Sequence, residues 1–145
     1  MTTHTSPPSP PRRHRLPDDR PSITHKFTIA GADETGRPLE HEGYLTVGLY
    51  EDGSPGEVFV RFAKLGGREG ALLDAWCTMV SIGLQCGMPI TVAIEKFRGW
   101  KFEPAGLTRN TDIRMVSSPL DYIVRWLDLR FSKEKRPTDA SPPGE

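Results

Sequence analysis

The stretch RPSITHKFTIAG, residues 20–31, gathers side chains that could support nucleophilic chemistry. Ser22 and His25 lie close together in sequence, and Asp18 or Asp19 could complete a serine–histidine–acid arrangement. Such a triad is defined by the spatial roles of its members, so short spacing in sequence is weak support for it. The serine also lacks the flanking glycines of a nucleophile elbow. We therefore interpret the stretch as the polar edge of a strand and predict no catalytic residue.

Two cysteines, Cys77 and Cys86, are the other candidate nucleophiles. They fall on one predicted helix at a separation that corresponds to about 900° of rotation, which places them on opposite faces. They cannot pair with each other in such a helix, and buried packing is the favoured role for both. The sequence has no CxxC or HExxH motif and no cluster with the spacing of zinc ligands. We expect neither a metal site nor a disulfide.

The segment KLGGREGALLDA, residues 64–75, is a candidate anion site because glycines precede a predicted helix. Backbone N–H groups at a helix N-terminus attract anions, and basic side chains nearby would assist them. The candidate residues are Lys64, Gly66, Gly67 and Arg68. Neither GxGxxG nor GxxxxGK[ST] is present, so an ordinary tight turn is favoured and no cofactor motif is identified. A small nucleotide- or anion-binding regulator stays as an alternative.

Periodicity predicts the elements that position these residues. Strands that alternate polar and apolar residues are expected at 23–29, 43–50 and 58–64, with the turn EDGSPGE at 51–57. Helices are expected at 69–85, 89–97 and 119–131, and the segment before the last helix shows no regular period. The predicted fold is α+β, a three-stranded antiparallel β-meander followed by three helices packed on one face.

Apolar stripes on the helices predict what they contact. The first helix should face the core with Leu72, Trp76, Met79, Gly83 and Cys86, with Leu73 and Val80 beside them. The last helix carries one stripe of aliphatic residues and a second stripe of Tyr122, Trp126 and Leu129. A helix that is apolar over so much of its circumference needs cover on two sides, either from the rest of the core or from another protein.

Composition divides the chain into one domain and two tails. Residues 1–15 form a proline-rich basic arm and residues 133–145 a second polar tail, and we predict that both are disordered. Residues 16–132 form the domain. The 19 basic and 19 acidic residues balance, which argues against nucleic-acid binding, although the basic arm keeps that alternative open. No apolar run is long enough to span a membrane and no signal peptide is evident, so a cytoplasmic protein is expected.

Several phrases, in order, resemble one family: RPSITHKF, EGYLTVGLYEDGSPGE, GALLDAW, FEPAGLTRN and DYIVRWLDLRF. The chain resembles the TSCPD-type C-terminal accessory domain of adenosylcobalamin-dependent ribonucleotide reductases, here as a stand-alone chain. The resemblance implies a context of deoxyribonucleotide synthesis for DNA. It also implies that the cobalamin, the nucleotide and the radical chemistry belong to a large barrel outside this region. No catalytic residue of the family maps onto this sequence, so no cofactor is expected in this chain.

The favoured hypothesis is a non-catalytic docking module. Its partner would be a reductase catalytic chain or a second copy of itself. The candidate partner-binding residues combine the basic start of the first strand with the second stripe of the last helix, because aromatic residues and arginine are common at interface centres. They are Arg20, His25, Lys26, Tyr122, Trp126 and Leu129.

Overall fold

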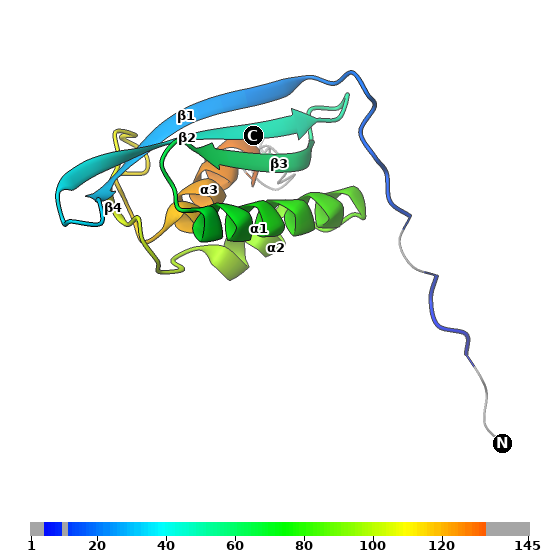
Figure 1. Cartoon of the computed structure of the whole chain (residues 1–145). Coiled ribbons are helices and arrows are strands. Elements are labelled where there is room, and N and C mark those ends of the chain that lie inside the picture. The colour runs from blue at the N-terminus through cyan, green and yellow to red at the C-terminus, as the bar shows by residue number, and fades with distance from the viewer. Residues whose placement is uncertain (1–4, 10–11, 133–145) are drawn as a thin grey trace, which may run out of the picture.

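Alternating polar and apolar side chains build a three-stranded antiparallel sheet. A computed structural model describes residues 5–9 and 12–132 of the chain (Figure 1). The strands are β1 (Ser22–Ala32), β2 (Pro38–Leu49) and β3 (Pro55–Phe62), which lie in the order β1-β2-β3. Gly53, with a φ of +86°, forms the tight turn between β2 and β3, a conformation that glycine adopts at little cost. The predicted β-meander is confirmed.

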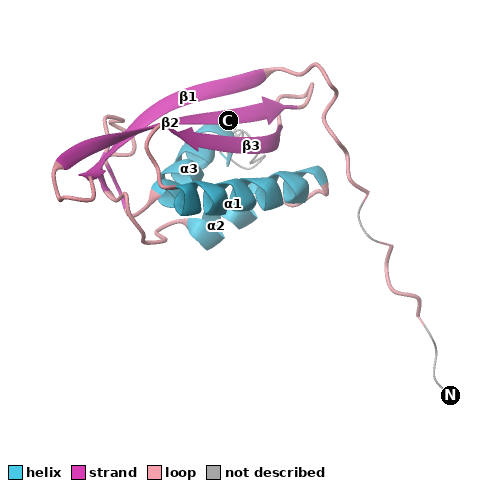
Figure 2. Cartoon of the chain, viewed as in Figure 1, coloured by secondary structure: helices cyan, strands magenta, loops and turns pink. Residues whose placement is uncertain are grey.

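Three α-helices follow the sheet. They are α1 (Gly67–Gln85), α2 (Ile90–Phe97) and α3 (Pro119–Leu127), and a π-helical turn, η1 (Asp128–Ser132), continues from α3. Two short strands, β4 (Gly106–Leu107) and β5 (Met115–Val116), pair in the segment for which the sequence predicts no regular structure. All three α-helices lie on one side of the sheet (Figure 2), so the predicted α+β class is confirmed.

The inner face of the sheet and α3 form the centre of the core. Alternate side chains of the strands are buried on that face, namely Phe27, Ile29, Leu45, Val47, Val58 and Val60. Eight of the nine residues of α3 are buried. The two apolar stripes of this helix are therefore covered mainly by the rest of the domain, which is the first of the two alternatives that the sequence leaves open.

Polar side chains of α1 close the free edge of β3. Ser81 Oγ accepts a hydrogen bond from the N–H of Val58 at 2.9 Å and donates one to its carbonyl at 3.2 Å. Gln85 Nε2 donates to the carbonyl of Gly56 at 2.9 Å. Ser81 and Gln85 are buried and lie about one turn apart on α1. Because an edge strand otherwise presents unpaired backbone groups, α1 protects one edge of the sheet.

Replacing Ser81 with alanine is expected to lower the free energy of unfolding by about 2 kcal/mol, since both backbone groups of Val58 then lose their partner. Urea denaturation followed by circular dichroism measures the loss. Thr78→Ala is the matched control, because the Thr78 hydroxyl is exposed and bonds only within α1. That variant should lose less than about 0.5 kcal/mol. Equal losses in the two variants would contradict the role of Ser81.

The core-facing side of α1 differs from the sequence prediction. Leu72 and Met79 belong to the predicted core stripe, yet they are 65% and 68% exposed. The buried apolar residues are Leu73, Cys77 and Val80, which directly follow the predicted core residues Leu72, Trp76 and Met79 in the sequence. The prediction is wrong because α1 is apolar around most of its circumference, so its pattern does not single out one side. Contact with β3 determines which side is buried.

Asp121 fastens the irregular segment between α2 and α3 to the core. Its buried carboxylate accepts hydrogen bonds from the N–H groups of Gly99 at 2.8 Å and Ser117 at 2.9 Å. Ser118 caps α3, because its Oγ accepts a hydrogen bond from the N–H of Asp121 at 3.0 Å. Both ends of the segment are therefore fixed by the start of one helix.

The N-terminal arm contacts the domain before the predicted boundary at residue 16. Arg13 Nε donates to Gln85 Oε1 at 2.7 Å, and the N–H of His14 donates to the Gln85 carbonyl at 2.8 Å. The rest of the predicted arm falls only partly within the described residues, and the predicted tail, 133–145, lies outside them. The arm therefore touches the C-terminal end of α1.

Candidate protein-interaction surface

The two basic residues predicted at the start of β1 are engaged within the domain. Arg20, just before β1, forms a bidentate pair with Glu57 of β3. Lys26 lies on the outer face of the sheet, with its ammonium 3.0 Å from the carboxylate of Glu42. Because both ion pairs are in contact with solvent, they add little to the stability of the domain. The positive charge of each basic side chain is largely balanced by the negative charge of its acidic partner.

His25 joins β1 to α3 through an aromatic cluster. Its Nε2 is 2.8 Å from the Tyr122 hydroxyl, and its ring stacks on Trp126 with the centroids 5.0 Å apart. Asn110 Nδ2 donates to the same hydroxyl at 3.1 Å. The Tyr122 oxygen therefore accepts from Asn110 while its O–H can donate to His25, which requires a neutral imidazole. This cluster ties together the sheet, the last helix and the segment before that helix.

Three of the predicted partner-binding residues come from the last helix, and the structure separates them. Tyr122 is fully buried and Trp126 is 8% exposed, so neither side chain is available at the surface. Leu129, in η1, is 41% exposed. The difference arises because β1 packs over the aromatic stripe through His25 and Phe27. Only Leu129 of these three remains accessible to a partner.

The stability of the domain is expected to depend on pH through His25. Burial lowers the pKa of His25 in the folded domain below the usual value near 6.5. The stabilisation is therefore fully present above pH 6.5 and is lost as the pH falls through the lowered folded pKa. Urea denaturation between pH 7.5 and pH 5 should show this decline, and His25→Gln should flatten it. His14→Gln, which replaces an exposed histidine, should leave the decline unchanged.

The predicted anion-binding residues are not assembled into one site. Lys64 and Gly66 line a groove of about 690 Å³ that also contains Glu69. Gly66 also lines a second groove, between β3 and α1, together with Gly67, and Arg68 lines neither groove. The four residues therefore do not converge on one ligand position.

Glu69 lies at the N-terminus of α1. A Cβ placed on Gly66 would be 2.4 Å from Glu69 Oε1, so the carboxylate approaches the first turn closely. Such a carboxylate interacts favourably with the partial positive charge of the helix terminus. It stands where the anion of a ligand would bind, so the geometry does not favour nucleotide or phosphate binding here.

Cys77 is unsuited to nucleophilic chemistry. Burial raises the pKa of its thiol to about 12, so the reactive thiolate is scarce at neutral pH. Cys86, at the end of α1, is half-buried. The described residues contain no group of three histidine, cysteine, aspartate or glutamate side chains placed to hold a metal. Within the same part of the chain, no helix is long and apolar enough to cross a bilayer.

The outward side of α1 carries an apolar stripe, which we call the α1 outer stripe: the exposed residues Leu72, Ala75 and Met79 and the half-buried Ile82. Its members recur at steps of three and four residues, the spacing typical of a helix that packs against another helix. Residues 75–94 contain no charged side chain. An uncharged apolar surface of this kind is typical of a protein-interaction site.

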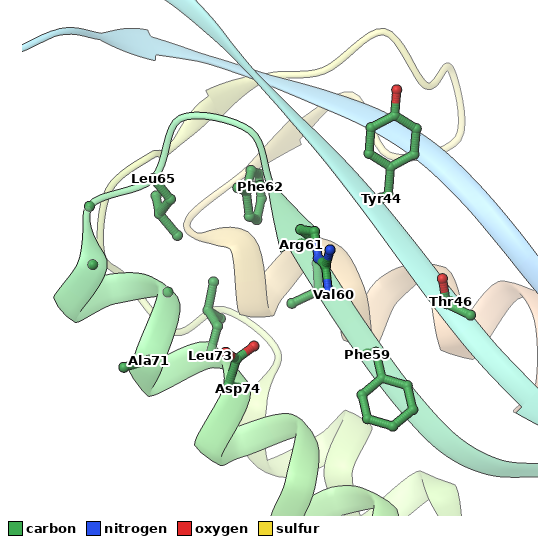
Figure 3. A pocket seen from close by; sticks show the side chains of 13 residues that line it. Tyr44, Thr46, Phe59, Val60, Arg61, Phe62, Leu65, Ala71, Leu73 and Asp74 are labelled. Atoms are coloured by element: carbon green, nitrogen blue, oxygen red, sulfur yellow. The ribbon is translucent and has the colours of Figure 1, made fainter.

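A groove of about 690 Å³ lies beside α1 on the side of β3 (Figure 3). Phe59, which is 48% exposed, and Arg61 contribute side chains from β3. Ala71 and Asp74 form part of the opposite wall on α1 (Figure 3). Within the described part of the chain Arg61 forms no ion pair, so its guanidinium is available to a partner. An aromatic ring next to a free arginine is a common composition for an interface.

The structure defines an α+β domain with exposed apolar side chains on α1 and β3. A comparison with protein families identifies the domain. The TSCPD domain family matches residues 9–131. The chain therefore belongs to the TSCPD domain family.

The chain is also similar to part of much longer proteins. It is 49% identical, over 93% of its length, to the vitamin B12-dependent ribonucleotide reductase of Rhodopirellula baltica, and the match covers 12% of that protein. It is 45% identical to the enzyme of the same name from Streptantibioticus cattleyicolor, in a match that covers 83% of this chain and 19% of that protein. It is 35% identical to the enzyme of the same name from Agrobacterium fabrum, in a match that covers 82% of this chain and 9% of that protein. The chain thus spans a small fraction of each relative and is linked to that enzyme family. No solved structure matches the chain significantly.

Proposed function

We propose that this domain is a non-catalytic accessory module that docks on the catalytic region of a vitamin B12-dependent ribonucleotide reductase. The observation that carries the proposal is the coverage of the relatives, since nearly the whole chain matches a small part of each reductase. In those proteins the domain is joined to a far larger polypeptide. The exposed apolar surfaces of the domain then have a partner held at high effective concentration.

The α1 outer stripe is the proposed docking surface. Leu72 and Met79 are about two-thirds exposed, and covering them removes apolar area from water. Their spacing fits a helix or an apolar groove of the catalytic region. The groove beside β3 would extend the contact, with Phe59 as an apolar anchor and Arg61 at its rim. Leu129 and the paired basic residues Arg20 and Lys26 lie outside this surface.

In this proposal the catalytic region of the reductase, and not this domain, carries out the chemical reaction. The cobalamin, the nucleotide and the radical steps would belong to the catalytic region, and this domain would hold no cofactor. Burial of the Cys77 thiol supports this assignment, because the thiol cannot supply an accessible thiolate. The domain would act in the cytoplasm, where the reductase supplies deoxyribonucleotides for DNA synthesis.

A reductase assay with the catalytic region and this chain added as a separate protein tests the proposal. We expect no turnover by the chain alone and a saturable change in the kcat or KM of the catalytic region when the chain is added. The double variant Leu72→Glu, Met79→Glu should remove that change, because it places charges on the docking surface. Leu107→Glu, at an apolar residue of β4 that is 57% exposed, should retain it. Turnover by the chain alone, or an addition without effect, would overturn the proposal.

A further inference from the structure

The two edges of the sheet differ in how completely other parts of the domain cover them. The edge of β3 is closed by Ser81 and Gln85 of α1. On β1, the outermost strand on the other side, only the C-terminal half is covered: Ile29 bridges to Thr108, and Gly106 packs directly against the carbonyl of Ala30. Among the described residues no strand pairs with the N-terminal half of β1 on its outer side, and Figure 1 shows this half along the rim of the sheet. An open edge of this kind is a template for another strand.

The register identifies which backbone groups face outward. The N–H of Leu49 donates to the carbonyl of Pro21, so odd-numbered residues of β1 bond to β2. In an antiparallel ladder the residues between them direct their N–H and C=O groups to the other side. For the open half of β1 these are Ser22, Thr24 and Lys26, which are all exposed. Three outward-facing backbone positions are therefore available for pairing.

We propose that β1 of a second copy of this chain pairs with this edge, antiparallel and about a two-fold axis through Thr24. The two sheets would join into one continuous sheet. Thr24 would lie opposite Thr24 of the second copy, and Ser22 would lie opposite Lys26 of the second copy. This register uses the open half alone and stops before the Ile29–Thr108 bridge.

A second copy fits the edge because the segment is self-complementary in this register. Like charges directly opposite each other destabilise paired strands, and here each Lys26 faces a serine while its charge is balanced by its own Glu42. On the inner face, Ile23 of one copy would lie beside His25 of the other. A two-fold contact of this kind is closed, so it yields a dimer and not an open filament. The dimer is independent of reductase docking, because α1 covers the opposite edge of the sheet.

Cysteine cross-linking tests the register. Directly opposed residues of a hydrogen-bonded antiparallel pair have Cα atoms about 5.5 Å apart, which is within the range of a disulfide. In a Cys86→Ser background, Thr24→Cys should therefore form a covalent dimer under mild oxidation. Ser22→Cys alone should cross-link poorly, whereas Ser22→Cys combined with Lys26→Cys should cross-link efficiently. Efficient cross-linking of Ser22→Cys alone, or none at Thr24→Cys, would overturn the register.

The mass in solution tests the dimer itself. Light scattering on the eluting wild-type chain should give twice the chain mass of 16.2 kDa at high concentration. Thr24→Pro removes an outward N–H without touching the bonds to β2, so the fold should persist while the dissociation constant rises about a hundredfold. Thr24→Ser keeps the N–H and should dimerise like the wild type. A monomer at all concentrations, or a dimer unaffected by Thr24→Pro, would overturn the proposal. Reductase binding that is lost in Thr24→Pro while the wild type is monomeric would also overturn it and assign the edge to a strand of the reductase.

Discussion

Replacing Tyr122 with alanine is expected to lower the free energy of unfolding by about 4 kcal/mol. The side chain is fully buried, and its ring stacks on Phe27 with the centroids 4.2 Å apart. Truncation leaves a cavity between β1 and α3 and removes the hydroxyl that bonds to His25 and Asn110. A loss of this size is a large part of the stability of a small domain. Urea denaturation followed by tryptophan fluorescence measures it.

Tyr122→Phe separates the ring from the hydroxyl. This variant keeps the packing and removes the two hydrogen bonds, so we expect a loss of about 1 to 2 kcal/mol. Burial raises the pKa of Tyr122 above its usual value near 10, so the hydroxyl is protonated at neutral pH. Equal losses in the two variants would show that the ring contributes little, and a loss below about 1 kcal/mol in Tyr122→Ala would contradict its place in the core.

Replacing Asp121 with alanine is expected to lower the free energy of unfolding by about 3 kcal/mol. The change removes the charged acceptor of two backbone N–H groups, those of Gly99 and Ser117. It also detaches both ends of the segment between α2 and α3, so amide hydrogen exchange should accelerate there first. Hydrogen exchange and urea denaturation together measure the effect.

Asp128→Ala is the control for this variant. Asp128 forms a partly exposed ion pair with Arg98 at 2.7 Å, and exposed pairs contribute less than about 1 kcal/mol. A loss in Asp121→Ala no larger than in Asp128→Ala would contradict the anchoring role of Asp121. Faster exchange throughout the domain, without a preference for the segment between α2 and α3, would contradict the local detachment.

The strands and the presence of the helices could be predicted because their signals are local. Alternation along β1 and β2 marks the inner face, and the predicted inner residues Phe27, Ile29, Leu45 and Val47 are buried there. The Asp-Gly pair at 52–53 identifies the turn before β3. Each of these signals depends on neighbouring residues alone, so a single sequence contains it in full.

The orientation of α1 could not be predicted, because two of its sides are apolar. Leu73 and Leu72 are adjacent and chemically alike, yet one is buried and the other is about two-thirds exposed. The distinguishing signal was the polar pair Ser81 and Gln85, which bond to the edge of β3. Ser81 and Gln85 stand in the mostly apolar second half of α1 and bond to that edge, although the sequence of the helix does not show which distant strand they contact.

The place of Tyr122 and Trp126 also depends on long-range packing. The sequence leaves both a core and an interface open for the aromatic stripe of α3. Contact with β1, almost a hundred residues earlier in the sequence, places the stripe in the core. His25 of β1 hydrogen-bonds to Tyr122 and stacks on Trp126. The α1 outer stripe was missed as a binding surface for the same reason, since its apolar residues fit a core equally well by composition.

Co-elution of this chain with the catalytic region of a vitamin B12-dependent ribonucleotide reductase tests the central proposal most directly. Size-exclusion chromatography with light scattering should show a complex of defined stoichiometry. The double variant Leu72→Glu, Met79→Glu should weaken the complex by more than about tenfold, while Leu107→Glu should co-elute like the wild type. Separate elution of the wild-type chain and the catalytic region would contradict the account, as would a complex that the double variant leaves intact.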